Sequence, residues 1–268
     1  MLFDRVILVF LLYLIPFAST LQCTINCSFK SELNSLFEIP NSCNETSLSK
    51  LCTFRMSYWY HKYYSYLSFD FDRSNSSSVK YYSTSIRLAD DGSIGFDYTI
   101  SHQCDQTDDC AMKFAKTNIP NLLRRLNFNY TDLRDELWPL LVSKTSIDDV
   151  DLSCFDSKAN IRQCALVKKP GLCQATQQLR GRKRMDRSCN QQLFSNEKTV
   201  SMFDFGSFAN LELKCNRSLC NGPMTFDTVK EILFRYNITK TIDGQLNQGI
   251  RCYSLSFLVF VLISIHLL

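Results

Sequence analysis

The sequence predicts an α+β fold of two tandem disulfide-rich units, each made of antiparallel strands followed by a short helix. A pair of closely spaced cysteines occurs twice, in residues 104–110 and 215–220. An amphipathic segment follows each pair, and each segment leads to an Asn-x-Thr triplet, at Asn129 and at Asn237. Self-similarity of this kind is typical of one structural unit used twice.

The segment behind each cysteine pair has helical periodicity. Apolar residues recur at i, i+3, i+4 and i+7, which places them on one face of an α-helix. These positions are Ile119, Leu122, Leu123 and Leu126 in the first copy and Val229, Ile232, Leu233 and Tyr236 in the second. A further helix is expected over 132–142, where leucines recur every four residues and Pro139 shortens or kinks it.

The residues before each cysteine pair have the alternation of strands. Apolar and polar residues alternate over 86–100, and Asp91-Gly92 between the two runs is a strong hairpin signal. Residues 203–213 repeat the pattern around Gly206 in shorter form. The aromatic run 58–71 also reads as strand, so about half of its rings are expected to face the core and half the surface.

The chain divides into five expected parts. Residues 1–20 have a basic residue, an apolar run and small residues, which is typical of a secretory signal peptide. Residues 21–142 are the first disulfide-rich domain, 143–153 the linker, and 154–247 the second domain. Residues 248–268 are a glycosylphosphatidylinositol (GPI) attachment signal or a short membrane anchor.

The C-terminal apolar tail favours the GPI signal. Residues 255–268 are almost wholly apolar, and no basic residue follows them. Such a run is short for a bilayer-spanning helix, which needs about 20 apolar residues, but it suits an attachment signal. Asn247 is the expected attachment site, and Asp243 is the second candidate. The alternative is a type I membrane protein that retains the tail as a short, tilted helix.

The cysteines agree with an oxidising compartment. The chain has 13, and removal of the tail with Cys252 would leave an even number. The 12 expected to form disulfides are Cys23, Cys27, Cys43, Cys52, Cys104, Cys110, Cys154, Cys164, Cys173, Cys189, Cys215 and Cys220. The local bridges Cys104–Cys110 and Cys215–Cys220 are predicted.

Equal spacing suggests how the remaining cysteines of the two copies correspond. The intervals 27–43 and 173–189 each enclose 15 residues, which aligns the first cysteine of one with the first of the other. Cys23 then corresponds to Cys164, and Cys52 and Cys154 have no counterpart. These two either close bridges within their own copies or bond to each other.

Asn-x-Ser/Thr triplets predict an N-glycosylated surface. The expected glycosylation sites are Asn26, Asn44, Asn75, Asn129, Asn216 and Asn237.

No residue set in the sequence predicts catalysis, a metal site or a cofactor. Histidine is scarce, with His61, His102 and His266, and no Gly-x-Ser-x-Gly turn or His-Glu-x-x-His helix is present. The three aspartates of residues 104–110 are too few for a calcium loop, and they are interpreted as an acidic surface turn. We therefore expect a protein that is not an enzyme.

The expected function is binding or adhesion by a GPI-anchored glycoprotein on the extracellular face of the plasma membrane. The aromatic run 58–71 and the basic loop 180–184 suggest a protein or an acidic glycan as the ligand. The net charge of +4 does not favour nucleic acid. The alternatives are an extracellular enzyme of unfamiliar type and a structural coat glycoprotein.

Overall fold

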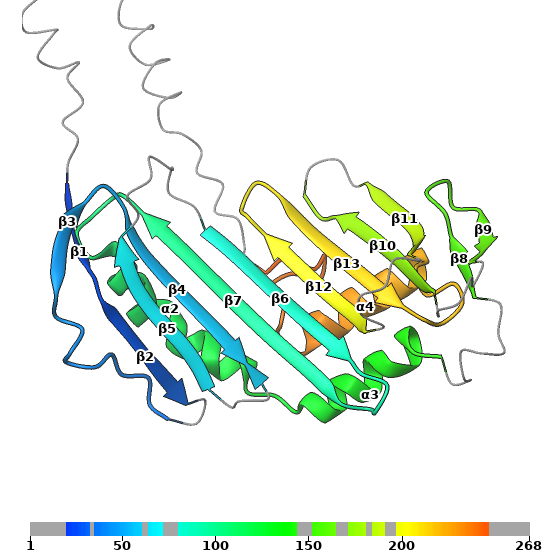
Figure 1. The fold of residues 1–268 in the computed structure, drawn as a ribbon, viewed down its shortest axis with the longest axis horizontal. Coiled ribbons are helices and arrows are strands. Elements are labelled where there is room, and N and C mark those ends of the chain that lie inside the picture. Colours follow the sequence, from blue (N-terminus) through cyan, green and yellow to red (C-terminus); the bar gives the residue numbers. More distant parts are fainter. Residues whose placement is uncertain are drawn as a thin grey trace, which may run out of the picture.

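The computed structural model describes residues 20–32, 35–60, 64–71, 80–143, 152–164, 171–180, 184–190 and 197–246. In this part of the chain, one nine-stranded sheet and two two-stranded sheets combine with three helices that lie behind the large sheet (Figure 1). The strands are β1 Leu21–Thr24, β2 Cys27–Glu32, β3 Thr46–Ser49, β4 Cys52–Trp59, β5 Tyr64–Phe71, β6 Lys80–Leu88, β7 Ile94–Cys104, β8 Ser153–Phe155, β9 Ile161–Gln163, β10 Leu172–Gln178, β11 Met185–Asn190, β12 Lys198–Asp204 and β13 Ala209–Cys215. The helices are α2 Cys110–Leu126, α3 Tyr130–Leu141 and α4 Pro223–Arg235.

The large sheet joins strands from both predicted domains. Its order is β11-β10-β13-β12-β6-β7-β4-β5-β2, and every neighbouring pair is antiparallel. The joint is the pairing of β6 with β12, in which Ile86 lies opposite Val200. The mixed fold with mainly antiparallel strands is confirmed, but the two tandem units are not, because one sheet spans both. Separate units would have left the backbone groups of β6 and β12 unpaired at two edges.

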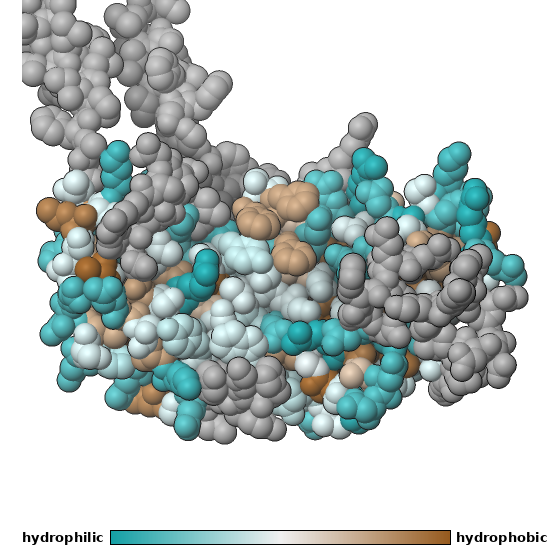
Figure 2. Space-filling model, viewed as in Figure 1, coloured by the Kyte–Doolittle hydropathy of each residue, from teal (hydrophilic) through white to brown (hydrophobic). Residues whose placement is uncertain are grey.

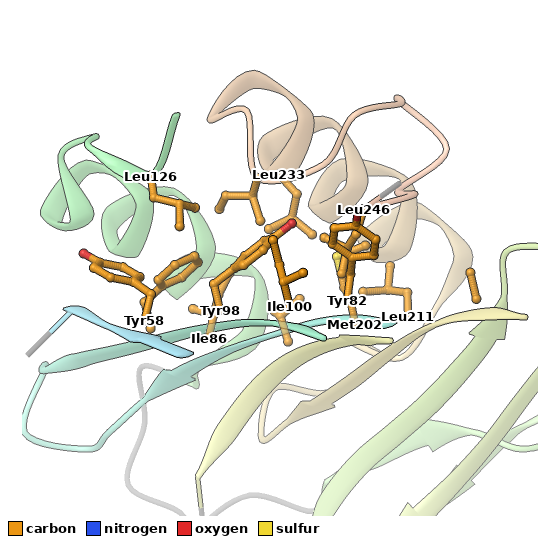
Figure 3. Packing of buried hydrophobic residues seen from close by; sticks show 14 of the residues in the cluster. Tyr58, Tyr82, Ile86, Tyr98, Ile100, Leu126, Met202, Leu211, Leu233 and Leu246 are labelled. Atoms are coloured by element: carbon orange, nitrogen blue, oxygen red, sulfur yellow. The ribbon is translucent and has the colours of Figure 1, made fainter. Parts of the chain in front are cut away.

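One hydrophobic core lies between this sheet and the helices. Alternate residues of each strand point toward the helices, as the period of two requires. In Figure 3, Tyr98 and Ile100 of β7 and Met202 of β12 share the layer with Leu126 of α2 and Leu233 of α4. The core is therefore continuous across the β6–β12 joint, and packing reinforces the hydrogen bonds that hold the two halves together.

The two predicted hairpin turns are present and have the same backbone conformation at glycine. Gly92 has φ 82° and Gly206 has φ 80°, a region that residues with a β-carbon seldom adopt. An aspartate precedes each glycine and stabilises the turn with its side chain: Asp91 accepts from the Ser93 N–H at 2.8 Å, and Asp204 accepts from the Gly206 N–H at 3.0 Å.

The helices are longer than their apolar periodicity indicated. α2 begins at Cys110, immediately after the disulfide corner, and its buried residues include the four predicted ones. Asn129 begins α3 as its N-cap, and its side chain accepts from the Thr131 N–H at 3.0 Å. α3 continues to Leu141 despite Pro139. α4 has Pro223 in its first turn, where a missing N–H costs no hydrogen bond.

Six disulfides connect the 12 predicted cysteines. They are Cys23–Cys52, Cys27–Cys43, Cys104–Cys110, Cys154–Cys173, Cys164–Cys189 and Cys215–Cys220. Both predicted local bridges are present, and each follows the last strand of its half.

The cysteine correspondence inferred from equal spacing is wrong. In the sheet, Cys52 lies opposite Cys104 and Cys173 lies opposite Cys215, so Cys52 and Cys173 occupy the equivalent positions. Each of them bonds to a cysteine of the preceding short strand, Cys23 in β1 and Cys154 in β8. Register therefore decides the correspondence, and the equal intervals of 15 residues are a coincidence.

Several predicted segments fall outside the described residues. These are residues 1–19, most of the predicted linker at 144–151, the attachment site Asn247, and the tail 248–268. Within the part of the chain that is described, none of the helices is both long and apolar enough to cross a membrane.

Candidate functional site

The large sheet has one face that the described helices leave uncovered, which we call the open face. Strand alternation directs the side chains between the buried positions toward it, and Figure 2 shows this side of the molecule. The open face includes Thr53, Arg55, Ser57, Tyr66, Tyr81, Ser83, Ser85, Arg87, Asp97, Thr99, Ser101, Gln174, Thr176, Thr199, Ser201, Phe203, Asn210, Glu212 and Lys214. A flat surface built on hydrogen-bonded strands is pre-organised, so binding to it would order little backbone.

Hydroxyl side chains occupy the centre of the open face, at the joint of the two halves. Ser85 of β6 lies opposite Ser201 of β12, and their Oγ atoms are 3.5 Å apart. Ser83 and Thr99 lie opposite each other on β6 and β7. Each hydroxyl can donate and accept, so this region can match the donors and acceptors of a partner surface.

The charged side chains of the open face include two ion pairs. Arg87 contacts Asp97 at 2.7 Å, and Lys214 contacts Glu212 at 3.0 Å. Gln174 also donates to Glu212 at 3.0 Å. Within each pair the positive and negative charges cancel, so these side chains do not give the open face a strong field of one sign.

Three exposed phenylalanines lie at the end of the open face, around the β12–β13 turn. Phe203, Phe205 and Phe208 are 37%, 46% and 42% exposed, and we call them the Phe hairpin. Tyr81 of β6 supports them, with its ring centroid 4.6 Å from that of Phe205. The pale brown rings above the centre of Figure 2 show the apolar residues gathered there. Clustered exposed apolar side chains indicate an interaction surface.

The aromatic run 58–71 lies partly where the sequence predicted. Tyr58 is fully buried, and Tyr60 stacks on Tyr130 with centroids 3.7 Å apart. Tyr66 is 40% exposed on the open face. The Phe hairpin was missed as a surface feature because alternation identifies the strand but does not show which neighbours cover its outward residues.

Four of the predicted glycosylation sites lie on exposed turns or helix ends, off the strands of the open face. Asn26 lies between β1 and β2, Asn44 in the loop before β3, Asn129 at the start of α3, and Asn237 after α4. Among the described residues, none of the triplets therefore places a glycan on the open face. Asn75 is outside the described residues.

Asn216 differs from the other described sites because it is buried. It is 8% exposed, and its Oδ1 accepts from the Ser143 N–H at 2.9 Å. A glycan is attached through Nδ2 of asparagine, so a glycan on the buried Asn216 would require the residues packed around it to move apart.

His102 lines a pocket between α2 and the paired ends of β6 and β7, where Lys80 lies opposite His102. The pocket has a volume of about 340 Å³, and its walls include Lys80, Lys113, Gln103 and Asn118. The imidazole stacks on Phe114 with centroids 4.0 Å apart, and Nδ1 has no hydrogen-bond partner among the described residues. The described residues that line the pocket include no carboxylate and no serine, so nothing there orients His102 as a general base.

Folding stability should depend on the protonation of His102. Burial, reinforced by the positive charge of Lys80, lowers the pKa of His102 from 6.5 to about 4. Below pH 6.5 the unfolded chain binds a proton that the folded chain does not bind, so stability is lost as the pH falls from 6.5 toward 4. We expect His102 to cost about 2 kcal/mol of unfolding free energy at pH 5 relative to pH 7. Urea denaturation at both pH values measures it.

The matched variant for this experiment is His102→Phe, which keeps a ring against Phe114. Groups other than His102 titrate in both proteins, so the difference between their pH dependences isolates the imidazole. Equal losses of stability on acidification in the two proteins would contradict a buried neutral His102.

The acidic corner of residues 104–110 has a structural role. Asp108 Oδ1 accepts from the Gln22 N–H at 2.8 Å, and Asp109 Oδ1 accepts from the N–H and hydroxyl of Thr24 at 2.8 and 2.9 Å. These bonds fasten β1 to the first corner. A group of cysteine sulfurs, from Cys154, Cys164 and Cys189, has metal-like proximity, but all three are disulfide-bonded.

The described residues of the basic loop have partners within the fold. Arg180 contacts the buried Asp204 at 3.0 Å, and Arg184 contacts Asp186 at 3.0 Å. Arg187, soon after the loop, lies over the ring of Phe155 at 5.8 Å. These contacts occupy the charges of the described arginines, which weakens the case for an acidic glycan as a ligand of those residues.

Neither a protein-family model nor a curated protein matches this chain. The open face and the Phe hairpin are therefore the features on which a function can be argued.

Proposed function

We propose that this chain is a GPI-anchored, N-glycosylated cell-surface protein that binds a protein ligand through the open face of its sheet. The observation that supports this most is the position of the described helices on one side of a nine-stranded sheet, so that no described helix covers the broad polar and aromatic surface on its other side. In α+β folds the helices usually segregate to one face of an antiparallel sheet. The other face is then available to solvent or to a partner.

The composition of the open face favours a protein as the ligand. Tyrosine, serine, threonine and amide side chains supply contact area and adaptable hydrogen bonds at low entropic cost, as in antibody binding sites. Small-molecule sites are instead concave and mostly apolar. The neutralised ion pairs at Arg87 and Lys214 argue against a highly charged glycan.

Placement outside the cell is supported by the cysteines and by the glycosylation sites. Six disulfides in a chain of 268 residues suit the secretory route, since reducing compartments keep thiols free. The four exposed glycosylation triplets lie off the strands of the open face, and two of them, Asn129 and Asn237, lie on the helix side of the sheet, so glycans there leave the open face clear for a ligand.

An arginine in the centre of the open face tests this proposal. Ser201→Arg places a long charged side chain where a ligand would have to bury it, and Glu231→Arg adds the same residue to the exposed side of α4. Each variant is displayed on cells that naturally express this protein, and a membrane-impermeant reagent then cross-links it to the protein ligand. Wild type and Glu231→Arg should give the same amount of the cross-linked complex. With Ser201→Arg the complex should fall by about tenfold or more, because an unpaired charge in an interface is strongly unfavourable.

Surface amounts and melting temperatures of both variants should match the wild type, so that the comparison reports binding. An undiminished complex with Ser201→Arg would exclude the open face as the ligand site. Phosphatidylinositol-specific phospholipase C should release the wild-type protein from the same cells. Retention of the protein after this treatment, with residues 248–268 still attached, would favour the type I membrane alternative.

A further inference from the structure

The last described residues of the chain lie at one particular end of the sheet. Leu246 is 1% exposed and packs beside Tyr82 and Met202 (Figure 3). Just before it, Gly244 lies against Leu179, since a β-carbon on this glycine would be 3.6 Å from Leu179 Cδ1. The Leu179 N–H donates to the Ala209 carbonyl at 2.7 Å. The segment that ends at Leu246 is thus fixed at the β12–β13 turn end of the sheet.

The Phe hairpin lies at this same end. Asp204 and Ala209 flank the turn that holds Phe205 and Phe208, and Tyr82 lies opposite Asp204 in the sheet. Lys80 and Arg184, the first residue of β6 and the residue before β11, also lie there. The structure therefore places the exposed aromatic rings and the last described residue at the same end of the sheet.

Both anchors considered for this chain require that this edge be close to the membrane. A GPI anchor at Asn247 would leave only its glycan core between the buried Leu246 and the lipid. A retained helix would begin at Leu255, after only the eight residues 247–254. Eight residues span at most about 29 Å when fully extended. The bilayer surface is therefore near the β12–β13 turn in either case.

We propose that the Phe hairpin is a membrane-contacting element, which inserts into the lipid headgroup region and sets the protein upright on its β12–β13 turn end. This proposal rests on the membrane anchoring proposed above. Aromatic side chains partition into the headgroup boundary of a bilayer. The side chains of Phe203, Phe205 and Phe208 are each more than a third exposed, so their rings are available for such contact.

A lipid surface suits this edge better than a protein ligand does. The hairpin is narrow and protrudes at a turn, whereas specific protein interfaces bury broad complementary areas. The short connection from Leu246 to either proposed anchor also keeps the Phe hairpin within reach of the lipid surface. If a protein covers these rings instead, lipid probes will not reach them.

The test places a tryptophan in the hairpin and measures quenching by brominated lipid. The full chain is purified from membranes and reconstituted in phosphatidylcholine nanodiscs with bromine high on the acyl chains. The emission contributed by the new tryptophan of Phe205→Trp should be about twofold lower than in unbrominated discs, because an interfacial ring penetrates about 5–10 Å. The control is Met224→Trp, which is 83% exposed at the start of α4, at the opposite end of β13. Its added tryptophan should not be quenched.

Trp59 and Trp138 give the same background in every variant. Phe208→Trp serves as a second probe if Phe205→Trp does not fold. Equal emission in brominated and plain discs for the hairpin variants, with the chain still bound to the discs, would overturn the proposal.

Failure of the anchor itself gives a different result. The chain would then elute apart from the discs, and the anchoring proposed above would be wrong. Soluble protein added to brominated phosphatidylcholine vesicles would still test the hairpin. Quenching of Phe205→Trp there would support lipid contact without an anchor, and its absence would overturn this inference as well.

Discussion

Replacing Asp204 with alanine is expected to lower the free energy of unfolding by about 3–5 kcal/mol, because it removes the buried carboxylate from an ion pair with a largely buried arginine. Asp204 is 1% exposed, and its Oδ2 is 3.0 Å from Nη2 of Arg180, which is itself 12% exposed. Its Oδ1 also accepts from the Gly206 N–H at 3.0 Å. One carboxylate thus links the end of β10 to the end of β12 and shapes the turn between β12 and β13. Urea denaturation followed by circular dichroism measures the loss.

Asp186→Ala is the matched control for this variant. It breaks the Arg184–Asp186 pair, in which the two side chains are 74% and 59% exposed, so its cost should stay below about 1 kcal/mol. Each variant removes one carboxylate from a pair with an arginine, but Asp204 is buried and also bonds to the Gly206 N–H, whereas Asp186 is exposed. Similar stabilities of Asp204→Ala and Asp186→Ala would show that Asp204 is not the structural link described here.

Phe96→Ala should cost about 3–5 kcal/mol of unfolding free energy through lost packing and the cavity it leaves. Phe96 is fully buried at the centre of an aromatic cluster. Its ring centroid lies 5.2 Å from Tyr130, 5.7 Å from Phe128 and 6.0 Å from Tyr58. The cluster fastens α2 and α3 to the first half of the sheet, so the cavity would lie between the layers. The denaturation midpoint in urea reports the change.

Phe234→Ala provides the comparison for this prediction. Phe234 is 42% exposed on α4, and alanine is a better helix former, so we expect a change within about 0.5 kcal/mol. A loss for Phe96→Ala no larger than that of Phe234→Ala would contradict the central position of this ring in the core.

Features that depend on neighbouring residues were predictable from the sequence. The i, i+3, i+4, i+7 pattern located α2 and α4, and alternation with Asp91-Gly92 located the β6–β7 hairpin. The two cysteine corners were also identified, since four or five intervening residues can close a disulfide without help from the rest of the fold.

Features that depend on distant pairing were not predictable. The pairing of Ile86 with Val200 joins segments more than 100 residues apart, and the sequence of neither strand identifies the strand with which it pairs. The same holds for Cys52 and Cys173, whose equivalence appears only in the register of their neighbours. The open face was foreseen only in part, because alternation alone does not say which side of the sheet the helices cover. Tyr58 points to the covered side, opposite Ser65, and Tyr66 points to the open face, opposite Ser57.

The central position of the β6–β12 pairing has a consequence for how the protein is made. Translation delivers β6 long before β12, so the nascent first half has a full-length strand edge with nothing to pair with it. Such an edge can template association with other chains. Biosynthesis of this protein therefore depends on keeping that edge shielded until the second half emerges, and truncated products that end between the halves would be the most prone to aggregate.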